Sequence, residues 1–285
     1  MERALTFKCR GEQLVGVLSE AAGTSSVGVL VLVGGPQYRV GSHRQFLLLA
    51  RRLAEAGLPT MRFDYRGMGD STGAVPSFEE TAPDIEAAIG AFKSACPNVG
   101  RVVLWGLCDA ASAALLYWRT ARDPSIAGMI LLNPWIRSAQ SIATTHVKHY
   151  YVQRLLDRQF WAKLASGGVN VTSALRELIA KLFTMSRHQQ PAGERDLGFQ
   201  DRMAAALAEF GGPVLLILSG RDYTAKEFLE YAGANRQWKG LITRDNVARA
   251  DLAKADHTFS TSAWRREVEA LTLDWLNRSV CIDAK

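Results

Sequence analysis

Continuous runs of apolar, mostly β-branched positions alternate along this chain with stretches whose apolar residues recur at helical spacing. Such runs are typical of strands buried on both faces of a sheet, and the helical spacing predicts helices that cover it. The predicted strands are 27–33, 59–64, the run that ends at Gly106, 126–132, 213–218 and 247–252. Helices are expected at 42–57, 81–95, directly after Cys108 and at 261–277. This alternation predicts an α/β fold with a mostly parallel central sheet and helices on both faces.

Two segments depart from that rhythm. The first ~20 residues alternate in polarity and turn at Gly11-Glu12, which predicts an N-terminal hairpin. Residues 137–208 are rich in long polar and aromatic side chains and contain no strong strand pattern. We expect an inserted helical cap there, over the carboxyl edge of the sheet, with residues 1–136 and 209–285 forming the core. Caps of this kind shape substrate pockets and exclude water.

Composition and charge narrow the class of protein. The chain has 285 residues, of which 48% are hydrophobic, enough for one large α/β domain with an insertion. The net charge is +6, but the arginines are dispersed, so we expect no nucleic-acid partner. The N-terminus lacks a signal-peptide pattern, and no run of about 18 apolar residues occurs, so we expect no membrane span. The oligomeric state stays open.

The four cysteines are far apart in the sequence and show no metal-ligand spacing. This usage fits a reducing cytoplasm better than a disulfide framework. A glycine loop of the kind that cradles phosphate is also missing. We therefore expect a cytoplasmic protein that needs neither a metal nor another cofactor.

The segment around Cys108 carries the clearest chemical signal. An apolar strand stops at Gly106, Cys108 follows two residues later, and a helix of small residues begins at once. This is the layout of a nucleophile elbow, G-x-S-x-G, with cysteine in place of serine and Ala110 in place of the last glycine. The helix N-terminus at the thiol favours a thiolate. A structural cysteine at the end of a core strand is the alternative.

A cysteine nucleophile needs a base, and the base needs an acid that orients it. His257 follows the last expected strand and precedes the final helix, and Asp222 follows the strand after the insertion. The order nucleophile, acid, histidine is the one found in α/β-hydrolases. The sequence therefore predicts a Cys108-His257-Asp222 triad. A surface histidine and a turn-forming aspartate are the ordinary alternatives for His257 and Asp222.

An acyl-transfer site also needs two N–H groups directed at the oxyanion. The amide of Asp109 follows the nucleophile directly, and Gly35 lies in the turn after the first buried strand. Pro36 has no N–H, so Gly35 is the expected second donor. Substrate contacts are expected from Gln37 and Trp135, and from His146 and His149 in the cap.

Four motifs resemble one family closely: VGGPQYRVGSHR at 33–44, FDYRGMGDS at 63–71, GLCDA at 106–110 and ADHTF at 255–259. They resemble the exosortase A system-associated hydrolases of type 1, which belong to the α/β-hydrolase superfamily. Val33 stands where the superfamily's H-G-x-P oxyanion turn has histidine. The resemblance implies an α/β-hydrolase fold and a setting beside exopolysaccharide and protein-sorting machinery, but it implies no substrate.

Thiolates attack acyl carbons well and leave readily, so the predicted activity is hydrolysis of an ester or thioester of a small-molecule acyl substrate through an acyl-enzyme. One alternative is an acyltransferase that uses the same thiol. Another is a non-catalytic member of the fold that binds a ligand or a partner.

Overall fold

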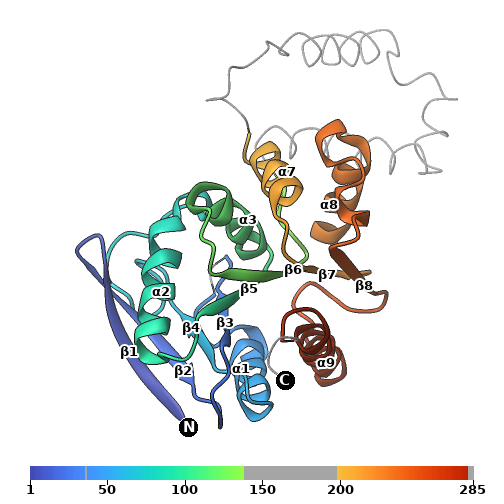
Figure 1. Ribbon diagram of the computed structural model, residues 1–285. Coiled ribbons are helices and arrows are strands. Elements are labelled where there is room, and N and C mark those ends of the chain that lie inside the picture. The colour runs from blue at the N-terminus through green and yellow to red at the C-terminus, as the bar shows by residue number, and fades with distance from the viewer. Residues whose placement is uncertain (36, 138–197, 282–285) are drawn as a thin grey trace, which may run out of the picture. The chain divides into compact units, whose positions relative to one another are not determined.

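The computed structural model describes residues 1–35, 37–137 and 198–281, and its centre is an eight-stranded sheet (Figure 1). The strands are β1 (Glu2–Cys9), β2 (Glu12–Ser19), β3 (Val27–Leu32), β4 (Thr60–Phe63), β5 (Arg101–Leu107), β6 (Ile126–Leu132), β7 (Val214–Ser219) and β8 (Val247–Leu252). Every position of β3, β4 and β7 is buried, as the continuous apolar runs of β3 and β7 predict.

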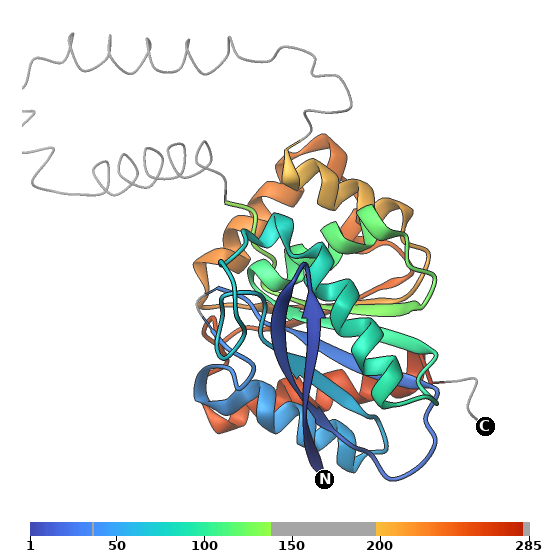
Figure 2. The ribbon, with the colours of Figure 1, turned by 90° about the vertical axis from the view of Figure 1, so that its left-hand side faces the viewer.

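The strand order is β1-β2-β4-β3-β5-β6-β7-β8. β1 and β2 form the predicted N-terminal hairpin, which lies in the foreground of Figure 2, and β2 pairs antiparallel with β4. All pairs from β4 through β3 to β8 are parallel. The prediction of a mostly parallel sheet is confirmed. Because the parallel strands point the same way, the segments after β3, β5, β7 and β8 meet at one edge of the sheet.

Helices cover both faces. Figure 1 shows α1 and α9 below the sheet, and α2, α3, α7 and α8 above it. Their bounds are α1 (Gln45–Glu55), α2 (Ala82–Ala95), α3 (Asp109–Ala121), α7 (Phe199–Glu209), α8 (Tyr223–Ala234) and α9 (Ser262–Ser279). The helix expected from residue 42 begins at Gln45, because His43 and Arg44 have positive φ angles of 53° and 61°. No helix among the described residues is long and apolar enough to cross a membrane.

The expected boundary of the insertion needs correction. The chain divides into one compact unit of Met1–Ile136 with Gly198–Lys285, and a second of Arg137–Leu197. The first therefore includes residues 198–208, which the sequence pattern assigned to the cap. The reason is packing: α7 buries Phe199, Met203 and Leu207, and the Trp118 ring on α3 stands edge-on to Phe210, which follows α7. Residues 138–197 lie outside the described part, so the helical cap remains a prediction.

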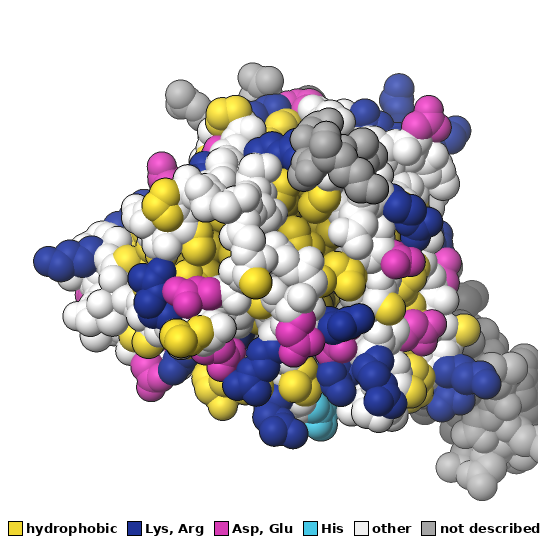
Figure 3. Space-filling model, turned by 60° about the horizontal axis from the view of Figure 1, so that its bottom comes forward, with side chains coloured by type: hydrophobic (Ala, Val, Ile, Leu, Met, Phe, Trp, Pro, Cys, Tyr) yellow, Lys and Arg dark blue, Asp and Glu magenta, His cyan; other side chains and the backbone are white. Residues whose placement is uncertain are grey.

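Charges of both signs share the surface. Figure 3 shows Asp and Glu side chains among the Lys and Arg of the lower face. The dispersed basic residues of the sequence thus stay dispersed on this face, despite the net charge of +6.

Candidate active site

Cys108 lies in the tight turn between β5 and α3. Its backbone has φ 64° and ψ −125°, a conformation that residues other than glycine rarely adopt. The Cys108 N–H donates to Leu132 O at 2.8 Å, and its carbonyl accepts from Trp135 N at 3.2 Å. A Cβ at Gly106 would lie 2.6 Å from the backbone of Ala110, so only glycine fits there. The structure thus has the elbow geometry that the spacing predicts.

The side chains of His257 and Asp222 meet at this edge of the sheet. His257 Nδ1 donates to Asp222 Oδ2 at 2.8 Å, and the Cys108 side chain lies close enough to the same imidazole to raise its pKa. Asp222 is the N-cap of α8, where it also accepts from Thr224 N at 3.1 Å and Ala225 N at 3.2 Å. These amides hold the carboxylate in one orientation, and the carboxylate in turn orients the ring.

Backbone bonds join the loop after β7 to the loop after β8. Gly220 N donates to Leu252 O at 2.9 Å, and Arg221 N donates to Ala255 O at 3.0 Å. A side chain at Gly220 would overlap the carbonyl of Ala253. The close approach of the two loops therefore requires glycine at this point, and it sets the distance between Asp222 and His257.

The charges around His257 favour its protonated form. The hydrogen bond to Asp222, and after it the bond to Cys108, raise the pKa of His257 to about 10, against the opposing effect of burial. A ring that keeps its proton at neutral pH can act as a proton donor beside Cys108.

The expected oxyanion donors lie close to the thiol, but one already has a partner. The Gly35 N–H donates to the carboxylate of Asp109 at 2.9 Å. The Asp109 N–H begins α3 directly after Cys108. Burial raises the pKa of Asp109, while the amides of Gly35 and Ala110 oppose that shift. The sequence reasoning did not foresee this contact of the Asp109 side chain with Gly35.

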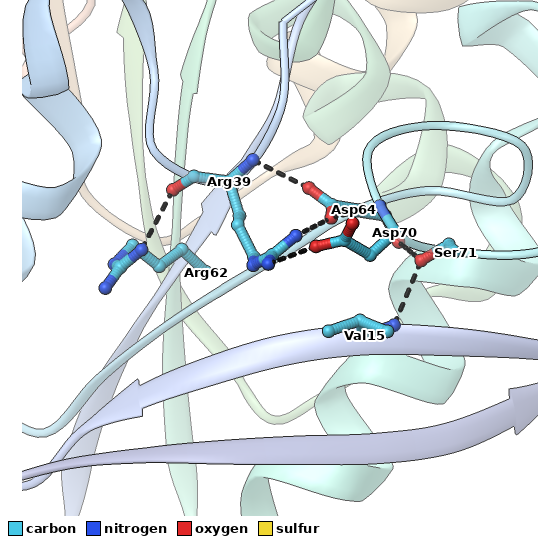
Figure 4. A network of polar contacts seen from close by, with 6 residues as sticks. All are labelled: Val15, Arg39, Arg62, Asp64, Asp70 and Ser71. Atoms are coloured by element: carbon cyan, nitrogen blue, oxygen red, sulfur yellow. Dashed lines mark hydrogen bonds and ion pairs between the residues drawn. The ribbon is translucent and has the colours of Figure 1, made fainter.

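A buried polar network anchors the chain beyond the oxyanion turn (Figure 4). Arg39 donates to Asp64 twice, from its backbone N at 2.7 Å and from its guanidinium, which also pairs with Asp70. Asp64 follows β4, is fully buried and accepts a further bond from Asp70 N at 3.1 Å. Arg62 Nη1 donates to the carbonyl of Arg39 at 3.2 Å. The loop after β3 is thereby fixed to the end of β4.

Two of the four residues expected to contact substrate, Trp135 and Gln37, belong to the described part of the chain. Trp135 is half-buried, and its backbone N donates to the carbonyl of Cys108. Gln37 accepts weakly from Ser42 N at 3.4 Å within the loop after β3. His146 and His149 lie outside the described residues.

Sequence reasoning missed Asn133, which ties three segments of the site together. Its side chain accepts from Ser219 N at 2.8 Å and donates to Ser219 Oγ at 2.9 Å and to His257 O at 3.2 Å. Asn133 is fully buried and has a φ of 44°. The available signal was an Asn-Pro pair directly after a buried strand, which is ordinary turn chemistry and so did not stand out.

The described residues include no candidate metal site. Within 1–35, 37–137 and 198–281, no group of three or more His, Cys, Asp or Glu side chains could hold an ion.

Solved structures share this fold at low sequence identity. The esterase Pf2001 of Pyrococcus furiosus aligns with a TM-score of 0.64 and 16% identity, covering 98% of this chain and 93% of that one. The α/β hydrolase GrgF from Penicillium sp. sh18 gives 0.62 and 16%, covering 98% and 99%. XC6422 from Xanthomonas campestris, an α/β serine hydrolase without lid, gives 0.57 and 14%, covering 97% and 94%. No curated protein sequence matches the chain.

The solved structures show the fold alone, whereas a family model shows the family to which the chain belongs. It covers residues 25–227, from β3 through the elbow and Asp222 into α8. The model describes the serine aminopeptidases, S33, so the match places an enzyme family around the Cys108 elbow. The fold, the elbow and this match agree: the chain belongs to the S33 serine aminopeptidase family of α/β hydrolases.

Proposed function

We propose that this protein hydrolyses an ester or thioester of a small-molecule acyl substrate through a Cys108-His257-Asp222 triad. The observation that carries the proposal is one imidazole that bonds to Asp222 at 2.8 Å and lies close enough to Cys108 for both side chains to raise its pKa. The pKa of His257, raised to about 10, supports a ring that is protonated at neutral pH and can donate to the leaving group.

Each step of the proposed reaction has a residue that carries it out. Cys108 Sγ bonds to the acyl carbon, and the carbonyl electron pair moves to oxygen. The proposed donors to that oxyanion are the amides of Asp109 and Gly35. Collapse breaks the bond to the leaving group, which takes the proton from His257. His257 then accepts a proton from water, which attacks the thioester of Cys108 and releases the acid.

The cysteine separates this chain from the serine chemistry in the family's name. A serine hydroxyl needs a neutral imidazole to remove its proton in the transition state, whereas a thiolate beside an imidazolium is already the nucleophile. A His257 ring whose pKa is raised to about 10 suits the second arrangement. We therefore infer that Cys108→Ser is a poor substitute even though serine is the residue of the G-x-S-x-G pattern.

Acylation of the thiol tests the proposal. Wild type should hydrolyse p-nitrophenyl acetate and an acetyl thioester, with the acyl-enzyme visible by intact mass after acid quench. Cys108→Ala should lose about 10³-fold or more in rate and form no adduct. Cys96→Ala and Cys281→Ala are matched controls, because burial raises the pKa of both thiols, and each should keep wild-type rates.

The outcomes separate the competing functions. Full activity in Cys108→Ala would refute the triad, and a folded wild type that is never acylated would favour a binding protein. Acyl transfer is recognised by adding an alcohol or amine acceptor: if the conjugate replaces the free acid, the acyl-enzyme serves a transferase.

We also keep the cellular setting as a proposal. The resemblance of the four motifs supports a link to exosortase and exopolysaccharide machinery. The four unpaired cysteines support a cytoplasmic location. Neighbouring genes for that machinery would support the link, and a purified protein with oxidised, paired cysteines would contradict the location.

A further inference from the structure

The carboxyl group of Asp109 is bonded to a backbone amide that the proposed reaction would use. Its Oδ2 accepts the Gly35 N–H at 2.9 Å, and this N–H is one of the two expected oxyanion donors. The backbone amides of Ala110 and of Asp109 itself also stabilise the ionised carboxylate. A negative oxygen of the protein thus takes the place that a negative oxygen of the substrate would take.

The surroundings are shaped to admit this carboxyl group. A side chain at Gly34 would overlap Asp109 Oδ1, so the absence of a Cβ there makes room for the carboxylate. Asp109 Oδ1 is buried and finds no hydrogen-bond partner among the described residues. On the other side of the turn, a Cβ at Gly35 would meet no atom of the described residues within 4 Å. The carboxylate therefore packs against Gly34, while the space beside Gly35 is open.

The Asp109 carboxylate and the acyl oxygen of the substrate would compete for the same N–H, that of Gly35. A single N–H donates one strong hydrogen bond, so Gly35 can stabilise either the carboxylate or the acyl oxygen. A carboxylate left in place would in addition repel the developing oxyanion. Reaction by this route therefore requires that the Asp109 carboxylate leave the Gly35 N–H, a movement that the bond at Oδ2 and the amides of Ala110 and Asp109 resist.

We propose that Asp109 is the resident anion of the oxyanion hole, which the acyl oxygen of the substrate displaces from the Gly35 N–H before attack by Cys108. This inference rests on the proposed function. It makes Asp109 a specificity-determining residue: acyl groups that bind weakly fail to displace the carboxylate, and the thiolate is protected from adventitious acylation.

Comparison of acylation with alkylation tests this role. Acylation of Cys108 by p-nitrophenyl acetate builds an oxyanion, whereas alkylation by iodoacetamide does not, so the ratio of the two rates isolates the oxyanion hole. Asp109→Ala frees Gly35 and should raise the ratio about tenfold or more. Asp109→Asn keeps a neutral acceptor, which binds an N–H about half as strongly, and should raise it less.

Asp256→Asn is the matched control. It removes a carboxylate from the residue before His257, but that carboxylate bonds to Ser260 at 3.0 Å and not to Gly35. Its ratio should equal that of wild type. An equal rise in this control would show that any lost charge near the imidazole has the same effect, and would overturn the inference.

The remaining outcomes are equally decisive. If wild type is acylated but the ratio stays level or falls in Asp109→Ala, Asp109 supports the turn and does not block it, and only this inference fails. If Cys108 is alkylated but never acylated in any variant, the proposed function fails and the inference fails with it. Each ratio is internal to one protein, so Asp109→Asn alone carries the test should Asp109→Ala not fold.

Discussion

The backbone of Cys108, at φ 64° and ψ −125°, is held away from its preferred conformations by the bonds around it. Strain of this kind persists only where the surrounding structure overrides it, and here it turns the thiol out of the sheet toward His257. The strained turn orients the Cys108 side chain, and the Asp222 carboxylate orients the His257 ring through the bond to Nδ1.

A pH-dependent stability follows from the His257–Asp222 pair. In a Cys108→Ser background, Asp222 remains as the larger cause that raises the pKa of His257 above 6.5. The folded ring then holds its proton more tightly than the unfolded one. The stabilisation is therefore complete below pH 6.5 and is lost as the pH rises through the folded pKa.

Urea unfolding of Cys108→Ser and of Cys108→Ser/His257→Gln measures this contribution. The difference between their midpoints should be larger at about pH 6 than at about pH 10. A difference that is the same at both would show that Asp222 does not hold the ring protonated in the folded protein.

Single residues were predictable from the sequence where their chemistry depends on order along the chain. Cys108, Asp222 and His257 each follow a recognisable strand, and the structure brings their side chains together. The position of the Asp109 side chain was not predictable. It depends on the missing Cβ of Gly34, a residue that is far away in the sequence and becomes a neighbour only in the fold.

At the scale of elements, the join between β5 and α3 depends on close backbone contact. Gly106→Ala would place a Cβ 2.6 Å from the backbone of Ala110, so the helix start must shift. We expect the free energy of unfolding to fall by about 1–3 kcal/mol, measured by urea denaturation. The elbow should distort as well, so alkylation of Cys108 should slow.

Gly90→Ala supplies the matched control within the same molecule. A Cβ at Gly90, inside α2, would meet nothing within 4 Å. The same substitution should there raise the free energy of unfolding by about 0.5–1 kcal/mol, because alanine favours a helix interior. If both variants lost stability equally, the contact at Ala110 would not be the cause.

Elements with continuous apolar patterns were predicted closely, and α8 was not predicted at all. The buried residues of α8 are the small Ala225 and Ala232 with Thr224 and Phe228, so its apolar pattern is weak. Asp222 caps this helix, whereas the sequence analysis considered it as a catalytic acid or a turn former and not as a cap. An aspartate at this point of the sequence fits both a helix cap and a catalytic acid, so the sequence alone supports either interpretation.

At the scale of the whole molecule, one polar network joins segments that are distant in the chain. Arg39 and Asp64 fix the loop after β3 to the end of β4 (Figure 4). Arg62 extends the network to Glu2 on β1, at 2.7 Å. Sequence reasoning noted these motifs through their resemblance to a family. It could not pair them, because the pairing depends on the sheet order.

Breaking the network at two points should have unequal effects. Arg39→Met leaves the fully buried Asp64 without its charged partner, and we expect a loss of about 3–5 kcal/mol in the free energy of unfolding. Asp70→Asn changes a carboxylate whose side chain is 68% exposed, and should cost less than about 1 kcal/mol. Calorimetry of both variants distinguishes a buried anchor from a surface pair, and equal losses would contradict the difference in burial.

The positions of Cys108, Asp222 and His257 along the chain also determine when the proposed site can form during synthesis. Cys108 follows β5, Asp222 follows β7, and His257 follows β8. Ribosomes deliver the N-terminal part first, so a nascent chain carries the cysteine long before the histidine that the proposed function assigns as its base. On that proposal, reactivity arises only once β8 has joined the sheet.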